Sequence, residues 1–92
     1  MNEKLLYKIH VTGRVQGVGF RHNAASEARY LGIKGFVKNL ADGNVYIEAE
    51  GTIDQLQTFI NWCHKGPRFG FAESVKVEES TPVYYSGFNI KY

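Results

Sequence analysis

The sequence predicts an α+β domain whose elements follow one another in the order β-α-β-β-α-β, with one further strand at the C-terminal end. Several short segments alternate apolar and polar residues, and two longer ones repeat apolar residues every three or four positions. The first pattern is typical of half-buried strands and the second of amphipathic helices. Because 92 residues can enclose one hydrophobic core, we expect a single domain over residues 1–92.

The first strand and the first helix are predicted on either side of a glycine-rich segment. Residues 5–12 alternate as a half-buried strand does, and Gly13 should end that strand. Apolar positions at helical spacing favour a helix over residues 21–31, and Gly32 is a suitable stop for it.

A hairpin should come next. Residues 33–40 read as a strand, and a second strand begins at Val45, with Asp42-Gly43 as the turn signal between them. In the second strand the alternation predicts that Glu48 and Glu50 lie on the solvated face of the sheet.

The second helix has a recognisable beginning and end. Thr52 should be its N-cap and Gln55 should complete a capping box, while Gly66 and the proline after it should end the helix. Two strands are predicted after it, over residues 72–79 and 83–91. This order implies two crossovers, with both helices on one face of a mostly antiparallel sheet, which is the ferredoxin-like plan. The plan alone does not specify a function.

The net charge and the cysteine content indicate which classes of binding partner and which cellular compartment to expect. Eleven basic and nine acidic residues give a net charge of +2, which is too small to indicate a bulk polyanion such as nucleic acid. Cys63 is the single cysteine, so no internal disulfide can form, and no apolar run is long enough to span a membrane. We therefore expect a cytoplasmic protein with neither a nucleic-acid nor a membrane partner.

The segment from Gly13 to Arg21 carries the pattern of an anion site. Its glycines let several backbone N–H groups turn toward one point, and the helix that follows adds unpaired N–H groups and a positive dipole end. Arg21 offers a planar fork that matches two phosphate oxygens. The segment matches neither a Walker A loop nor a dinucleotide fingerprint, because His22 stands where the latter needs glycine. Taken alone, the same residues could also form an ordinary tight connection.

The identities of the residues are more specific than this general pattern, because two motifs occur in order along the chain. Residues 13–21, Gly-Arg-Val-Gln-Gly-Val-Gly-Phe-Arg, resemble the signature of the acylphosphatase family, and residues 31–39, Leu-Gly-Ile-Lys-Gly-Phe-Val-Lys-Asn, resemble its second signature. Residues 42–45 and the later Gly66-Pro67 also fit the family, so the resemblance covers nearly the whole chain. Ala24 and Leu40 depart from residues that are common in the family, but Arg21 and Asn39 match.

The resemblance implies an enzyme that hydrolyses small-molecule acyl phosphates to a carboxylate and inorganic phosphate. No metal, no cofactor and no covalent phosphoenzyme would be needed, and a monomer would suffice. Arg21 would bind the phosphoryl group and Asn39 would orient the attacking water. The backbone of the segment before Arg21 would hold the phosphoryl oxygens, through Arg14, Val15, Gln16, Gly17, Val18, Gly19 and Phe20.

Two other classes of protein are alternatives. An RNA-binding module of the same fold is suggested by fragments of an aromatic RNA-binding motif at residues 34–37 and 68–71, although Glu48 and Glu50 would repel RNA. A non-catalytic anion-binding domain would keep the glycine segment and lose turnover.

Cys63 and the three histidines are the remaining residues with chemistry of their own. Cys63 and Arg68 are one residue too close for a cysteine-phosphatase motif, and Cys63 continues an apolar helical stripe, so we expect a buried structural thiol. The histidines show no metal-ligand spacing, and His22 is expected on the helix surface.

Overall fold

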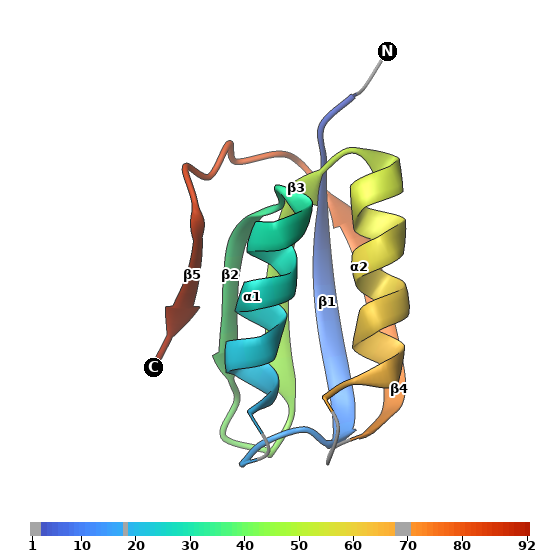
Figure 1. Ribbon diagram of the computed structural model, residues 1–92, viewed down its shortest axis with the longest axis vertical. Coiled ribbons are helices and arrows are strands. Elements are labelled where there is room, and N and C mark those ends of the chain that lie inside the picture. The colour runs from blue at the N-terminus through green and yellow to red at the C-terminus, as the bar shows by residue number, and fades with distance from the viewer. Residues whose placement is uncertain (1–2, 18, 68–70) are drawn as a thin grey trace.

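The computed structural model describes residues 3–17, 19–67 and 71–92, and its elements follow the predicted order. They are β1 (Leu5–Arg14), α1 (Phe20–Leu31), β2 (Lys34–Asn39), β3 (Val45–Gly51), α2 (Ile53–Lys65), β4 (Phe71–Ser80) and β5 (Phe88–Lys91). One sheet holds these strands in the order β4-β1-β3-β2-β5, and both helices cover the same face of it (Figure 1). The predicted ferredoxin-like α+β fold with an added C-terminal strand is confirmed. Neither helix in this described part is long and apolar enough to cross a membrane.

The strands pair in a mostly antiparallel sheet. β1 pairs with β3 and β4, and β3 pairs with β2, all antiparallel, whereas β5 runs parallel to β2. The prediction that Gly13 ends the first strand is wrong by one residue, because β1 continues to Arg14. The register against β4 shifts between Thr12 and Gly13, so a bulge lets the strand continue through the glycine.

The core lies between the helices and the inner face of the sheet. Alternate residues of the strands meet small and apolar residues of the helices, as the sequence periodicities predict. The largest contributors from the strands are Ile9, Val11, Val37, Val45 and Ile47, and those from the helices are Phe20, Ala24, Ala28, Leu56, Phe59 and Cys63, all fully or almost fully buried.

Local capping fixes where the two helices begin and end. Gly19 and Gly32 flank α1 with φ near 80°, a left-handed conformation that favours glycine. At the start of α2 the Thr52 hydroxyl accepts the Gln55 N–H, and the Gln55 side chain accepts the Thr52 N–H at 2.8 Å. The predicted capping box and the predicted helix end at Gly66 are confirmed.

The hairpin between β2 and β3 places Asn39 at the edge of the core. Asn39 follows Val37 by two residues, so both side chains lie on the face that the helices cover. The chain then turns through residues 40–44, where the Asp42 carboxylate accepts the Asn44 N–H at 3.0 Å. This tight turn keeps Asn39 at the end of its strand.

Two predictions are wrong, one about the extent of the last strand and one about the face of the sheet away from the helices. The last strand covers Phe88–Lys91 and not residues 83–91, because β4 and β5 lie at opposite edges and the chain between them has to cross the sheet. The crossing segment, residues 81–87, contacts the face away from the helices. Glu50 is consequently fully buried beneath it rather than solvated, and Glu48 is half-buried.

Gly35 should be essential for the pairing of β2 with β3. A Cβ built there, at φ 140°, would lie 1.8 Å from the Glu48 carbonyl oxygen, so the two strands would have to separate. We expect Gly35→Ala to lower the free energy of unfolding by about 3 kcal/mol in urea titrations. Gly87→Ala is the matched control, since no described atom lies within 4 Å of its Cβ position. Equal stability of the two variants would contradict the expected clash.

Candidate active site

The loop between β1 and α1 is fastened at both ends by buried apolar side chains. Val15 and Phe20 are each about 1% exposed, and the Phe20 ring lies 5.3 Å from the Trp62 ring, between centroids. Between these two anchors Gly17 and Gly19 are exposed and have φ of 76° and 80°. The loop can therefore adopt left-handed turns without being free to drift away from the core.

The loop leads directly into the N-terminus of α1. Gly19 is the N-cap residue, and among the described residues no side chain caps the first N–H groups of this helix. Asn23 instead fastens the cap from inside the helix, because its backbone and side-chain N–H groups both donate to the Gly19 carbonyl oxygen, at 3.0 and 2.8 Å. The first turn thus presents N–H donors and a positive dipole end toward the loop.

Arg21 extends from this first turn and is supported by the C-terminal end of the chain. Its Nη1 donates to the Lys91 carbonyl oxygen at 3.2 Å, and its Cζ lies 4.7 Å from the centre of the Tyr92 ring. A guanidinium carries five N–H donors, so these contacts orient the group and leave most of its donors for another acceptor.

Asn39 contributes a buried acceptor. Its Oδ1 is buried and meets no hydrogen-bond donor among the residues that the structure describes. A buried polar atom normally has a partner, and exceptions are often found where a site receives a ligand or a water molecule. The amide therefore has an acceptor to offer at the end of β2.

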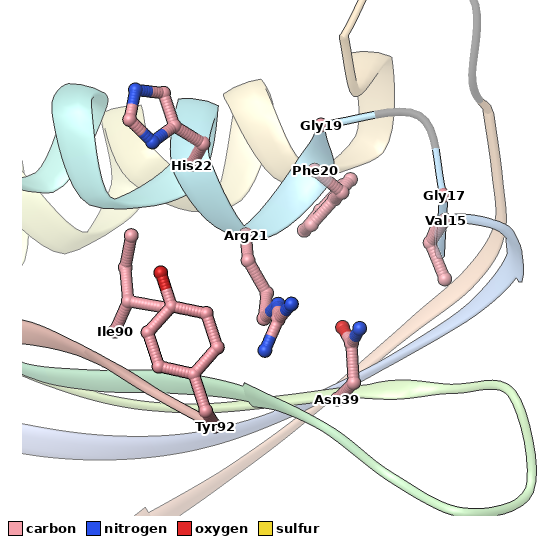
Figure 2. A pocket seen from close by; sticks show the side chains of 9 residues that line it. All are labelled: Val15, Gly17, Gly19, Phe20, Arg21, His22, Asn39, Ile90 and Tyr92. Atoms are coloured by element: carbon pink, nitrogen blue, oxygen red, sulfur yellow. The ribbon is translucent and has the colours of Figure 1, made fainter.

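These residues line one pocket of about 170 Å³. Figure 2 shows the Arg21 guanidinium and the Asn39 amide pointing toward one another beneath the loop. The lining residues are Val15, Gly17, Gly19, Phe20, Arg21, His22, Asn39, Ile90 and Tyr92. The loop glycines, the arginine and the asparagine predicted from the sequence are thus brought together.

The other predicted loop residues lie differently. Arg14 is exposed at the end of β1, and neither it nor Gln16 lines the pocket. Val18 lies outside the described residues.

Gln16 has a role that the sequence did not suggest. Its Nε2 donates to the carbonyl oxygens of Leu40 and Asn44, both at 2.8 Å. One side chain thereby ties the glycine loop to the turn that directly follows Asn39. The loop and the asparagine come from separate parts of the chain, and this pair of bonds links the loop to the turn beside the asparagine.

Ile90 and Tyr92 line the pocket and were not predicted from the sequence. They come from the end of the C-terminal strand, whose parallel pairing with β2 brings them beside the pocket. No local motif marks them, because only the strand order places them there. His22 is exposed as expected, but it also lines the pocket.

Cys63, the other sequence candidate that the structure describes, has no place in this site. Cys63 is fully buried in the core, and burial raises the pKa of its thiol, which confirms the prediction of a structural cysteine. Arg68 lies outside the described residues. Within the described ranges no three His, Cys, Asp or Glu side chains are arranged to hold a metal ion.

Removing the two hydrogen bonds of Gln16 should weaken phosphate binding in the pocket without unfolding the protein. We expect Gln16→Leu, which keeps the side-chain volume and loses both hydrogen bonds, to raise the Kd for inorganic phosphate by about tenfold in calorimetric titrations. Gln57→Leu on the exposed side of α2 is the matched control and should leave the Kd unchanged. Identical phosphate affinity in both variants would show that the tie does not shape the pocket.

Comparison with known proteins agrees with the fold and identifies the family. The acylphosphatase family model matches residues 7–90. An acylphosphatase from Thermotoga petrophila is 49% identical over 85 residues, covering 92% of this chain and 94% of that protein. The crystal structure of acylphosphatase from Bacillus subtilis superposes with a TM-score of 0.93 at 42% identity, covering 96% of this chain and 99% of that one. An acylphosphatase structure from Coxiella burnetii has the same TM-score at 33% identity, covering 98% and 94% of the two chains. This chain belongs to the acylphosphatase family and is an acyl phosphate hydrolase.

Proposed function

We propose that the glycine loop and Arg21 hold the phosphoryl group of the acyl phosphate while Asn39 orients the water that attacks it. The observation that carries this assignment is the meeting of three donor and acceptor sources in one pocket. The loop and the first turn of α1 supply N–H groups, Arg21 supplies charge, and Asn39 supplies a buried acceptor that has no partner among the described residues.

The phosphoryl oxygens need hydrogen-bond donors and positive charge in the transition state. Phosphoryl transfer is promoted mainly by positioning and by charge stabilisation, and preorganised N–H groups achieve both without rearranging during the reaction. Here the donors are fixed in advance, because Val15 and Phe20 anchor the loop and the Lys91 carbonyl oxygen orients Arg21. These groups would replace the charge that Mg²⁺ supplies in many other phosphoryl-transfer enzymes.

Asn39 suits the placement of a neutral nucleophile. An Oδ1 acceptor takes one O–H of a water molecule and leaves an oxygen lone pair free to face phosphorus. An amide also adds no negative charge beside an anionic substrate, as a carboxylate at this position would.

The reaction balances with substrate and water alone. The water oxygen forms a bond to phosphorus, and the bond from phosphorus to the bridging oxygen breaks. The leaving carboxylate keeps the electron pair, and a proton of the water ends on the phosphate or in the medium. A carboxylate leaves readily, so the chemistry does not demand a general acid.

Replacing Arg21 should remove binding and turnover together. We expect Arg21→Gln to raise the Kd for phosphate beyond measurement and to lower kcat/KM for benzoyl phosphate by about 10³-fold or more, because the charged fork is lost. Lys65→Gln removes one charge at the exposed end of α2 and serves as the control. Ordinary phosphate affinity in folded Arg21→Gln protein would refute the assignment of Arg21.

Replacing Asn39 should lower turnover and leave phosphate binding nearly unchanged. We expect Asn39→Ala to bind phosphate with nearly the parental Kd while kcat falls by about 10²- to 10³-fold, since orienting water matters only in the transition state. Asn61→Ala on α2 is the matched control. A variant with a parental kcat and a weakened Kd would assign Asn39 to phosphate binding instead.

The family membership favours the enzyme over a non-catalytic anion-binding module or an RNA-binding one. The metal-free mechanism, the single domain, the monomeric state and the cytoplasmic location stay predictions. Sedimentation can test the monomeric state, and cell fractionation can test the location.

A further inference from the structure

The buried glutamate of β3 has no part in the mechanism above, yet its side chain accepts three main-chain hydrogen bonds on the face of the sheet away from the helices. Glu50 is 0% exposed, and its Oε2 accepts the N–H groups of Val83 and Tyr84, the latter at 2.8 Å. Its Oε1 accepts the N–H of Tyr85 at 2.7 Å. Three successive backbone amides therefore enclose one carboxylate.

This arrangement holds the crossing segment in an unusual conformation. Tyr84 has φ of 64°, and it is the only described residue other than glycine with positive φ. A left-handed residue between ordinary ones turns neighbouring N–H groups toward a common point, which suits an anion. A buried carboxylate is costly unless its oxygens are hydrogen-bonded, and these three amides meet that requirement.

Glu48 holds the same segment at a second point. Its Oε1 accepts the Tyr85 hydroxyl at 2.5 Å, and its Oε2 accepts the Tyr46 hydroxyl at 2.6 Å. Burial alone would raise the pKa of Glu48, but the two tyrosine hydroxyls and nearby lysines outweigh it and lower that pKa. The Tyr85 ring also packs edge-on against Phe36 of β2, with centroids 5.9 Å apart.

The crossing segment leads straight into β5. The Gly35 N–H donates to the Gly87 carbonyl oxygen at 2.8 Å, and from Phe88 onward β5 pairs with β2 in parallel. The start of β5 is also held from α1, because Arg29 Nε and Nη2 donate to the Phe88 carbonyl oxygen at 3.0 and 2.9 Å. The position of this start along β2 determines where β5 ends. Its end provides the Lys91 carbonyl oxygen and the Tyr92 ring that support Arg21.

We propose that Glu50 is a positioning residue for the phosphate site, which acts by fixing the crossing segment at residues 83–85 and hence the placement of the end of β5 against Arg21. The inference rests on the phosphate-binding role proposed for Arg21. Asn39 lies on β2 and is tied through Gln16 to the loop, so the water-positioning step should be little affected by Glu50.

The test compares Glu50→Gln with Glu79→Gln, the same change at an exposed glutamate of β4. A glutamine keeps the volume but turns an NH₂ donor toward an amide N–H, so the three-bond arrangement cannot form. At a temperature where circular dichroism shows all variants folded, we expect Glu50→Gln to raise the Kd for inorganic phosphate about 3- to 10-fold. KM for benzoyl phosphate should rise similarly while kcat stays near the parental value, and the amides of residues 83–85 should exchange hydrogen faster.

Two further variants separate positioning from general destabilisation. Tyr85→Phe removes only the hydroxyl bond to Glu48, and it should move the Kd in the same direction by a smaller factor, even if Glu50→Gln does not fold. Tyr92→Ala removes one of the groups through which Glu50 would act. The effect of Glu50→Gln on the Kd should therefore shrink when both changes are combined.

Distinct outcomes overturn the inference and the proposed function. If Arg21→Gln abolishes phosphate binding but folded Glu50→Gln and Tyr85→Phe bind as the parent does, Glu50 only stabilises the fold and this inference is wrong. The inference is equally wrong if the effects of Glu50→Gln and Tyr92→Ala simply add. If Arg21→Gln itself binds phosphate normally, the proposed role of Arg21 fails first.

Discussion

The conformation of the loop between β1 and α1 is the constraint on which the rest of the site depends. To hold an anion with backbone N–H groups, the loop has to turn through left-handed residues, and Gly17 and Gly19 provide these turns. Glycine also gives the unfolded and the native loop more freedom than any other residue would. The neighbouring residues limit that freedom, because Val15 and Phe20 are buried in the core at the two ends of the loop.

The partners of the loop come from elements that are remote in the sequence and adjacent in the sheet. Gln16 joins the loop to the turn after β2, across 24 and 28 residues, and so connects the proposed phosphate-binding loop to the turn that follows Asn39. β5 lies on the outer side of β2 and supports Arg21 from there. The loop and Arg21 are thus each held by contacts with another part of the chain, and preorganised sites require such support.

The sequence predicted those parts of the fold and of the site that depend on local signals. The capping box at Thr52 and the turn at Asp42-Gly43 are determined by residues within four positions, and both occur as predicted. Arg21 and Asn39 were marked by motifs that lie at the ends of neighbouring elements, and the fold brings both to one pocket.

The features that the sequence did not predict depend on distant residues. Glu50 alternates as an exposed strand residue should, and its burial follows only from a segment 34 residues later that crosses above it. The same crossing shortened the last strand, since a chain that has to reach the other edge of the sheet cannot pair on the way. Ile90 and Tyr92 reach the pocket through the parallel pairing of β5, which no periodicity reveals.

The most direct test of the proposed mechanism is the hydrolysis of benzoyl phosphate by the purified protein in excess EDTA, compared with the rate after Mg²⁺ is added in excess of the chelator. The central claim is that donors belonging to this chain supply all the charge stabilisation that the reaction needs. We therefore predict the same kcat/KM in both conditions. Activity that disappears in EDTA and returns with Mg²⁺ would contradict that claim.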